Sequence, residues 1–299
     1  MGGKDINIYL EEKKEFIDQC LAEILRAYPK YPRVIHDAME YTVMAGGKRI
    51  RPILFLATAE MLETGIEKSL GKIGCTLELV HTYSLIHDDL PALDNDDMRR
   101  NQPTCHIAYD EATAILTGNA LLSLAFEVIA DYGQAQNCPG KSLALVGELA
   151  RASGTKGMIG GQVLDLWAEG REVSWEEVEE INNRKTGALI KAAVRMGGLV
   201  RGASHEQINK LSKYGESLGH GFQIADDMLD LQGDSKKMGK SSGMDQARNK
   251  ATYPLRFGVD KAMEKVNELY QESVAALDYF GEEAAILREL SRLLIFRDR

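Results

Sequence analysis

Cysteine, proline and long apolar runs are all scarce in this sequence of 299 residues. The four cysteines lie far apart, and none belongs to the Cys-x-x-Cys pair that is typical of zinc sites and redox dithiols. Isolated cysteines are typical of reduced thiols, so we expect a cytoplasmic protein. The seven prolines are scattered and mark no linker. No uninterrupted apolar stretch reaches the roughly 20 residues of a membrane-spanning helix, so we predict no membrane span.

Positive charge is also in deficit. Asp and Glu number 45 against 36 for Lys and Arg, which gives a formal net charge of −9. A general nucleic-acid binder needs a basic surface, so we predict no nucleic-acid partner. The hydrophobic content of 44% excludes a disordered chain and is sufficient for a large core. The net charge is still compatible with a local basic site for an anionic small molecule.

Helical periodicity is what the sequence has in abundance. Apolar residues recur every three or four positions, as in residues 17–25, which is the pattern of amphipathic helices. Ser174 and Ser204 each begin a capping-box pattern, which predicts that a helix starts directly after each serine. We find no convincing run of alternating strand residues and no biased linker. The sequence therefore predicts one large all-α domain over residues 1–299.

The most informative segment is the aspartate-rich stretch at residues 87–100. The apolar run before it predicts a helix whose last turn carries Asp88 and Asp89, and Pro91 must end or bend that helix. Like charges about 4 Å apart repel by roughly 4 kcal/mol at an effective dielectric of 20, and a helix C-terminus is itself negative. The cluster therefore predicts a bound cation.

A second acidic cluster, at residues 226–230, lies within another apolar helical run. Asp226 and Asp230 are one helical turn apart and share a face. Magnesium binds one or two carboxylates and completes its octahedron with water and phosphate oxygens. Two such helices facing each other would hold magnesium between the protein and a polyphosphate. A single D-D-x-x-D motif is more often a solvated helix end, but two clusters on apolar helices favour the metal site.

Cations gather at one glycine-containing loop, Gly46-Gly47-Lys48-Arg49-Ile50-Arg51-Pro52. The glycines allow backbone to approach an anion closely, and Arg51 offers a bidentate guanidinium. In an acidic protein with two candidate metal sites, this basic loop predicts a phosphate-binding clamp. Gly239-Lys240-Ser241 is no P-loop, because Asp234 stands where the first glycine of that motif is required.

In this order, the motifs resemble those of the short-chain trans-isoprenyl diphosphate synthases, in particular the bacterial type of farnesyl diphosphate synthase. The resemblance also rests on Gly160-Gly161-Gln162, Lys185-Thr186-Gly187, Phe222-Gln223 and Lys250-Ala251-Thr252-Tyr253-Pro254. It implies an all-α bundle around a deep central cavity, usually a homodimer, that joins isopentenyl diphosphate head-to-tail to an allylic diphosphate. Two positions depart from the family pattern: Asn119 replaces a common aspartate, and Asn101 replaces the glycine that often follows Arg-Arg.

The resemblance implies a role for each candidate site residue. The magnesium ligands are Asp88, Asp89, Asp94, Asp226 and Asp230. The isopentenyl diphosphate site comprises Lys48, Arg51, His81 and Arg100. The allylic diphosphate site comprises Arg99, Lys185, Thr186, Gln223 and Lys240. Magnesium neutralises the leaving pyrophosphate, and the carbonyl and hydroxyl dipoles around Lys185, Thr186 and Gln223 stabilise the allylic cation, so these three are the predicted catalytic residues.

Product length is predicted from Tyr83. It lies five residues before Asp88, about 7.5 Å along a helix axis, so its ring is expected below the aspartates. From geometry alone, an ordinary core tyrosine is an equal alternative. In the family, a bulky residue here, together with two extra residues between the motif aspartates, accompanies fifteen-carbon products. We therefore expect farnesyl diphosphate, with Tyr83 as the cavity floor and Ser84 beside it.

Four alternatives share parts of this pattern. The first is a geranylgeranyl diphosphate synthase of the same family. A terpene cyclase also ionises an allylic diphosphate, but it needs no second diphosphate site, which leaves the basic loop and His81 without a purpose. A non-catalytic subunit of the same fold is expected to have substituted motif aspartates, and none is substituted here. A diphosphate carrier that binds without turnover is the last alternative.

Overall fold

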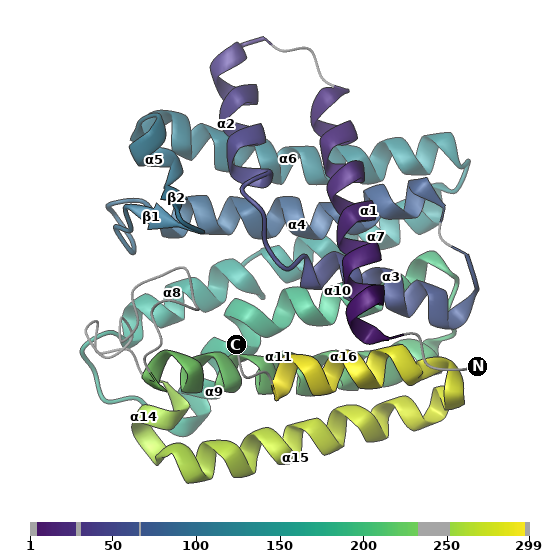
Figure 1. Cartoon of the computed structure of the whole chain (residues 1–299), viewed down its shortest axis with the longest axis vertical. Helices are drawn as coiled ribbons and strands as arrows, with labels where there is room; N and C mark the ends of the chain where they lie inside the picture. The colour runs from purple at the N-terminus through teal and green to yellow at the C-terminus, as the bar shows by residue number, and fades with distance from the viewer. Residues whose placement is uncertain (1–4, 28–30, 66, 233–251, 297–299) are drawn as a thin grey trace. The chain divides into compact units, whose positions relative to one another are not determined.

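The computed structural model describes residues 5–27, 31–65, 67–232 and 252–296. Helices make up most of this part of the chain (Figure 1), which confirms the all-α prediction. The elements are α1 (Ile6–Arg26), α2 (Arg33–Val43), α3 (Ile50–Leu62), α4 (Lys68–Asp88), β1 (Met98–Arg99), β2 (Gln102–Pro103), α5 (Cys105–Ala108), α6 (Glu111–Ala135), α7 (Pro139–Ser153), α8 (Met158–Ala168), α9 (Trp175–Asn182), the π-helix η1 (Asn183–Gly187), α10 (Ala188–Val200), α11 (His205–Gln232), α14 (Tyr253–Phe257), α15 (Val259–Leu277), the 3₁₀-helix η2 (Asp278–Ala284) and α16 (Ala285–Ile295).

The chain divides into two compact units. The first unit comprises Met1–Leu56 and Gly65–Val146, and the second comprises Ala57–Thr64 and Gly147–Arg299. Helices α3 and α7 each contribute residues to both units, because the boundaries at Leu56 and Val146 fall inside them. The single domain over residues 1–299 stays a prediction.

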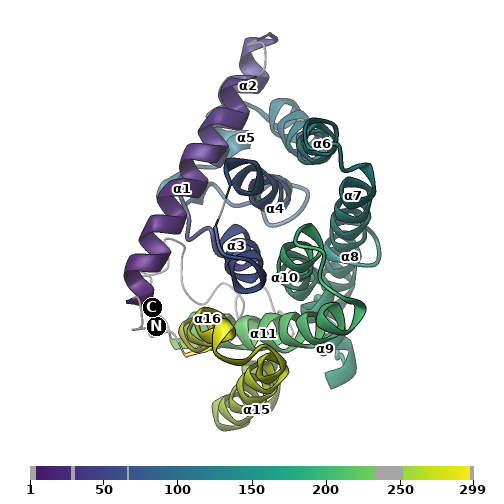
Figure 2. The same cartoon turned by 90° about the vertical axis from the view of Figure 1, so that its right-hand side faces the viewer.

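Helix α4 forms the core of the first unit. It packs against α6 and α1, and Figures 1 and 2 both show α4 and α6 side by side. Buried residues occur on every side of α4 between Leu70 and Ile86. A helix that is apolar all round is one that neighbouring helices enclose, so α4 can carry the first acidic cluster out of the core at its C-terminal end.

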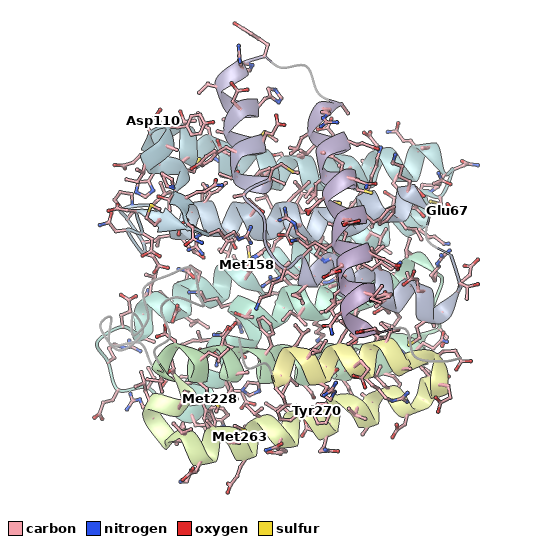
Figure 3. All side chains as sticks on the ribbon, viewed as in Figure 1. Glu67, Asp110, Met158, Met228, Met263 and Tyr270 are labelled. Carbon is pink, nitrogen blue, oxygen red and sulfur yellow. The ribbon has the colours of Figure 1, made fainter. Side chains whose placement is uncertain are left out.

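Helix α6 is apolar over most of its length and begins at a side-chain cap. The Asp110 carboxylate, labelled in Figure 3, accepts a hydrogen bond from the Thr113 backbone N–H at 2.8 Å. By length and composition, α6 is the one helix of the described residues that could cross a membrane. A buried core helix passes the same test, and Leu121 and Ile129 of α6 are fully buried. Polar residues such as Asn119 interrupt its apolar run, which explains why the sequence predicted no span.

Helix α11, with 28 residues, is the longest element of the second unit that the structure describes. It packs against α10 and α15. The Ser204 hydroxyl accepts from the Gln207 N–H at 3.2 Å, and the Gln207 side chain accepts from the Ser204 N–H at 2.8 Å. Ser174 and Glu177 make the same reciprocal pair before α9, at 3.3 and 2.8 Å. Both predicted helix starts are confirmed.

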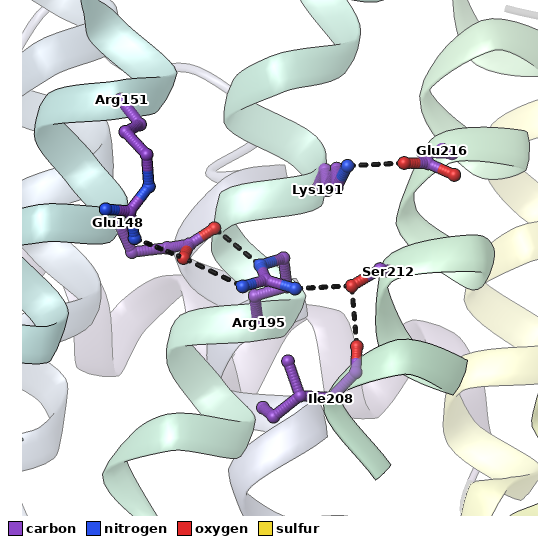
Figure 4. Close-up of polar contacts among 7 residues, drawn as sticks. All are labelled: Glu148, Arg151, Lys191, Arg195, Ile208, Ser212 and Glu216. Atoms are coloured by element: carbon purple, nitrogen blue, oxygen red, sulfur yellow. Dashed lines mark hydrogen bonds and ion pairs between the residues drawn. The ribbon is translucent and has the colours of Figure 1, made fainter. Parts of the chain in front are cut away.

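An ion-pair network connects α7, α10 and α11 in the second unit (Figure 4). Arg195 donates to the carboxylate of buried Glu148 at 2.5 and 3.1 Å and also to the Ser212 hydroxyl. Burial acts to raise the pKa of Glu148, but Arg195 and Arg151 outweigh it and hold this pKa below its ordinary value. Removing one member of such a network leaves an uncompensated charge, so the network fixes the packing of these helices.

Candidate active site

The first acidic cluster forms a tight turn at the C-terminal end of α4. The Asp94 N–H donates to the Asp88 carbonyl at 2.8 Å, and the Asp96 N–H donates to the Asp89 carbonyl at 3.2 Å. These backbone bonds fold the chain back on itself after Pro91, which lies just beyond the helix as predicted. The predicted metal ligands Asp88 and Asp94 therefore belong to one turn, and both are half-buried.

Asp89 and Arg99 form an ion pair within this turn. The Asp89 side chain is buried, and it accepts hydrogen bonds from the Arg99 Nε at 2.7 and 2.9 Å and from the Arg99 Nη2. Burial acts to lower the pKa of Arg99, and the carboxylate of Asp89 more than offsets this effect. Asp89 thus orients the guanidinium of Arg99. Their assignments to magnesium and to the allylic diphosphate stay predictions.

Several basic side chains gather around the Gly46-Gly47 turn in the first unit. Arg100 donates to the Gly46 carbonyl, and a Cβ atom on Gly47 would lie 2.7 Å from the Arg100 guanidinium and displace it. The φ of 131° at Gly47 also favours glycine. Burial, followed by the charges of Arg51 and Arg100, lowers the pKa of His81 well below its ordinary value. The structure thus brings together three predicted isopentenyl diphosphate residues. Lys48, the fourth, is exposed on the same loop.

Arg49 differs from the other cations of this loop. It is 2% exposed, and its guanidinium donates to Asp18, to Glu78 and to the Val43 carbonyl, each at 2.8 Å. In the sequence, Arg49 belongs to the cations beside the glycines. The structure shows that it faces inward, because two carboxylates from α1 and α4 hold it there.

A short hairpin carries the second pair of arginines. Strands β1 and β2 pair antiparallel, with Arg99 opposite Gln102, and the two residues between them have positive φ: 53° at Arg100 and 62° at Asn101. Two left-handed residues are what a two-residue hairpin turn requires, and asparagine tolerates this conformation better than most residues. This explains how Asn101 can replace glycine. The sequence did not predict the hairpin, because strands of two residues show no alternation.

Tyr83 is buried on α4, on the side of the helix that meets α6. Its ring makes an edge-to-face contact with His87 at 5.0 Å, and the His87 Nε2 lies 3.2 Å from the Ile115 carbonyl of α6. Burial raises the pKa of Tyr83, and the charge of Asp88 adds to the increase. The phenol therefore lies within electrostatic range of a predicted metal ligand.

In the second unit, two predicted allylic-site residues lie in the π-helix η1. Lys185 and Thr186 belong to this five-residue segment, which joins α9 to α10. The Lys185 Nζ lies 2.5 Å from the Asp165 carboxylate of α8. A Cβ atom on Gly161 would lie 2.2 Å from the Lys185 backbone nitrogen, so this glycine allows α8 to contact η1. Single π turns inside α-helices frequently occur at functional sites.

Thr186, Gln223 and Asp227 form a hydrogen-bonded chain. The Thr186 hydroxyl donates to the Gln223 Oε1 at 2.6 Å, and the Gln223 Nε2 donates to the Asp227 Oδ1 at 2.7 Å. This order fixes which end of the Gln223 amide faces Thr186. Asp227 and Asp165 are supporting residues that the sequence motifs do not identify. The position of Asp227 four residues after Gln223 is the signal that could have found it.

The remaining predicted residues are placed as follows. Asp226 and Asp230 lie one turn apart on α11, and both are half-buried. The Ser84 hydroxyl on α4 donates to the His81 carbonyl at 2.9 Å. Lys240 lies outside the described residues.

The carboxylates of both acidic clusters suit a divalent metal, because hard oxygen donors are the ligands that such ions prefer. Within the residues described, no group of three or more His, Cys, Asp or Glu side chains could hold an ion by itself. Magnesium needs only one or two protein carboxylates when phosphate oxygens and water complete its shell. The donor set therefore fits a metal that the protein shares with a diphosphate.

The helical fold, the two acidic clusters and the basic loop are typical of enzymes that act on diphosphates. The sequence profile of the polyprenyl synthetase family matches residues 32–285, and the chain belongs to this family. It is a short-chain prenyl diphosphate synthase, a prenyltransferase of isoprenoid biosynthesis. Members of the family use a divalent metal and act on isopentenyl and allylic diphosphates.

Individual relatives carry two different product names. The chain is 40% identical to farnesyl diphosphate synthase of Escherichia coli (strain K12), over 94% of this chain and 95% of the relative. It is 41% identical to geranylgeranyl diphosphate synthase of Cyanophora paradoxa, over 97% of this chain and 96% of the relative. The crystal structure of an FPP/GFPP synthase from Zymomonas mobilis matches with a TM-score of 0.86 and 35% identity, covering 97% of this chain and 99% of that chain.

Proposed function

We propose that this chain is a farnesyl diphosphate synthase. It condenses isopentenyl diphosphate with dimethylallyl diphosphate and then with geranyl diphosphate, and Mg²⁺ is its metal. In each round the allylic carbon–oxygen bond breaks and pyrophosphate leaves with the bonding electrons. The double bond of isopentenyl diphosphate then attacks the allylic cation, a carbon–carbon bond forms, and the released pyrophosphate accepts the proton that is lost.

The metal supplies the charge that stabilises the departing pyrophosphate. Asp88 and Asp94, with Asp89 beside them, hold it at one cluster, and Asp226 and Asp230 hold it at the other. The turn at the end of α4 supports the first assignment, because its backbone hydrogen bond holds Asp94 next to Asp88.

The basic side chains form two groups, one for each substrate. Lys48, Arg51, His81 and Arg100 hold isopentenyl diphosphate. This assignment is supported by the hydrogen bond from Arg100 to the Gly46 carbonyl and by the charges of Arg51 and Arg100, which add to burial in lowering the pKa of His81. An anion is favoured where several positive charges lie close together. Arg99, Lys185 and Lys240 hold the allylic diphosphate.

The allylic cation is stabilised by Thr186, Gln223 and the backbone around Lys185. Preorganised dipoles act on a developing charge without the cost of reorientation. The hydrogen bonds from Thr186 to Gln223 and from Gln223 to Asp227 support this role, because they fix both dipoles before substrate binds.

The observation that carries the fifteen-carbon product is the burial of Tyr83 below the first acidic cluster. Tyr83 is 7% exposed, and its ring packs against His87 on the stretch of α4 that precedes Asp88. With Ser84 beside it, this ring ends the cavity in which the prenyl tail grows. The geranylgeranyl product is the second candidate, because a relative of that name is as similar to this chain as the farnesyl relative.

Product analysis of Tyr83→Ala tests this assignment. The wild-type enzyme, given isopentenyl diphosphate, dimethylallyl diphosphate and Mg²⁺, is expected to release farnesyl diphosphate, as shown by chromatography of the dephosphorylated products. Tyr83→Ala is expected to shift the mixture toward twenty carbons with turnover retained. Tyr83→Phe is the matched control, because it keeps the ring volume. A folded Tyr83→Ala variant that still stops at fifteen carbons contradicts the role of Tyr83, and a wild-type enzyme that makes mainly twenty carbons contradicts the product.

We also propose that the enzyme is a homodimer in the cytoplasm. Ile115 and Leu116 on the outer face of α6 are 42% and 58% exposed, and Leu143 on α7 is 73% exposed. An exposed apolar face of this kind supports association with a second copy. The four cysteines are free thiols, which supports a reducing compartment. Analytical ultracentrifugation is expected to give twice the mass of one chain. Leu116→Lys is expected to reduce the measured mass to that of a single chain.

A further inference from the structure

The inward-facing Arg49 is the feature of the basic loop that substrate binding does not explain. Its side chain is 1% exposed, and its guanidinium contacts Asp18 of α1 and Glu78 of α4, each at 2.8 Å. Burial acts to lower the pKa of Arg49, but Glu78 and Asp18 raise it above its ordinary value, so the side chain stays charged. A buried and fully engaged arginine cannot bind a diphosphate.

The backbone at Arg49 is unusual as well. Its φ of 52° is in the left-handed region, which residues with a Cβ atom seldom adopt. Such a conformation persists where surrounding contacts hold it, and it is enriched at functional sites. Here the guanidinium supplies those contacts, because it also donates to the Val43 carbonyl at the end of α2.

We propose that Arg49, held by Asp18 and Glu78, is a positioning residue for the isopentenyl diphosphate site. Lys48 precedes it and Arg51 follows two residues later, so the anchored backbone at Arg49 sets the position from which both cations reach the diphosphate. This inference rests on the proposed function, because it concerns one of the two proposed substrate sites. It also gives α1 a role, since α1 supplies Asp18.

The charges of Arg49 and Glu78 also help to position Arg100, another residue of the proposed isopentenyl diphosphate site. Arg100 is drawn to the Gly46 carbonyl of this loop, and its pKa is lowered by burial and by Arg49, while Glu78 acts in the opposite direction. Without Glu78, the positive charges of buried Arg49 and half-buried Arg100 would repel each other. The buried carboxylate therefore allows Arg49 and Arg100 to occupy neighbouring positions.

The variant Asp18→Asn tests the proposal, and Glu23→Gln is its matched control. Both residues lie on α1, both pair with a cation, and their side chains are 31% and 38% exposed. Glu23 pairs with Lys68 at the start of α4 rather than with the basic loop. Asp18→Asn is expected to raise the KM for isopentenyl diphosphate about tenfold, because a charge-assisted hydrogen bond to Arg49 is weakened. The KM for geranyl diphosphate is expected to stay within about twofold, and Glu23→Gln is expected to change neither.

Arg49→Lys extends the test, because lysine keeps the charge but cannot reproduce the planar fork that contacts two carboxylates. It is expected to raise the same KM further. If Arg49→Lys fails to fold, Asp18→Asn still tests the proposal. Asp18 is partly exposed, so its substitution leaves no fully buried charge unpaired. An unchanged KM for isopentenyl diphosphate in Asp18→Asn, or an equal rise for both substrates, overturns the proposal.

Calorimetric titration with isopentenyl diphosphate alone separates this proposal from the proposed function. A wild-type protein that binds isopentenyl diphosphate without turnover contradicts the proposed function. In that case a tenfold weaker affinity in Asp18→Asn still supports the anchor, and an unchanged affinity overturns it.

Discussion

We expect His220 to make the free energy of unfolding depend on pH. It lies on α11, is 3% exposed and stacks on Trp175 of α9 at 5.7 Å. Its Nδ1 is 3.5 Å from the Glu179 carboxylate, and its Nε2 is buried with no hydrogen-bond partner among the residues that the structure describes. Burial, followed by the charge of Lys265, lowers the pKa of His220 from 6.5 to about 4.

This shift determines the sign of the pH effect. The folded protein keeps His220 neutral down to about pH 4, whereas the unfolded chain binds a proton near pH 6.5. The stabilisation is therefore complete above pH 6.5 and is lost as pH falls toward 4. Between pH 7 and pH 5, this one residue should lower the free energy of unfolding by about 2 kcal/mol.

The measurement is urea unfolding of the wild type and His220→Leu at pH 7 and pH 5. The quantity compared is the loss of unfolding free energy between the two pH values, since any fixed effect of the substitution cancels. The wild type should lose about 2 kcal/mol more than His220→Leu. His205→Ala is the control, because that histidine is exposed at the start of α11. Equal losses in the wild type and His220→Leu would show that His220 is not buried in its neutral form.

Two further predictions concern the site itself. Asp88→Ala and Asp226→Ala should each lower turnover by orders of magnitude with the helical circular-dichroism spectrum unchanged, because each removes charge stabilisation made mainly in the transition state; near-normal turnover in either variant contradicts the metal assignment. Arg51→Lys should raise the KM for isopentenyl diphosphate more than the KM for the allylic substrate, since lysine lacks a bidentate fork. Steady-state kinetics with each substrate varied in turn decides this, and equal effects contradict the division between the two sites.

The sequence predicts the features of this chain that depend on local pattern. Both capping boxes begin helices, and α4 ends at Asp88 with Pro91 just beyond it. These outcomes follow from backbone chemistry that a few neighbouring residues determine. From the sequence, the apolar residues beside the second acidic cluster are expected in the core. Ile224 is fully buried, whereas Phe222 and Leu229 are only half-buried.

Long-range partners are what the sequence could not supply. Asp165 supports Lys185 from 20 residues away, and Asp18 reaches Arg49 across 31 residues. Whether an arginine in a basic loop turns outward to a ligand or inward to a carboxylate depends on which helices pack beside it. Spacing along the chain contains no information about that choice, so it does not distinguish Arg49 from its neighbours.

The π-helix η1 has a consequence for insertions and deletions. A π turn spans one residue more than an α turn, and each residue of an α-helix rotates the chain by about 100°. Deleting one residue from Asn183–Gly187 would therefore convert the segment into ordinary α-helix and leave α9 and α10 in nearly the same phase. The same deletion inside α10 would instead rotate everything before it by about 100°, and Trp175 of α9 would leave His220. The π segment is thus the place between these two helices where the chain length can change by one residue with the packing of Trp175 on His220 retained.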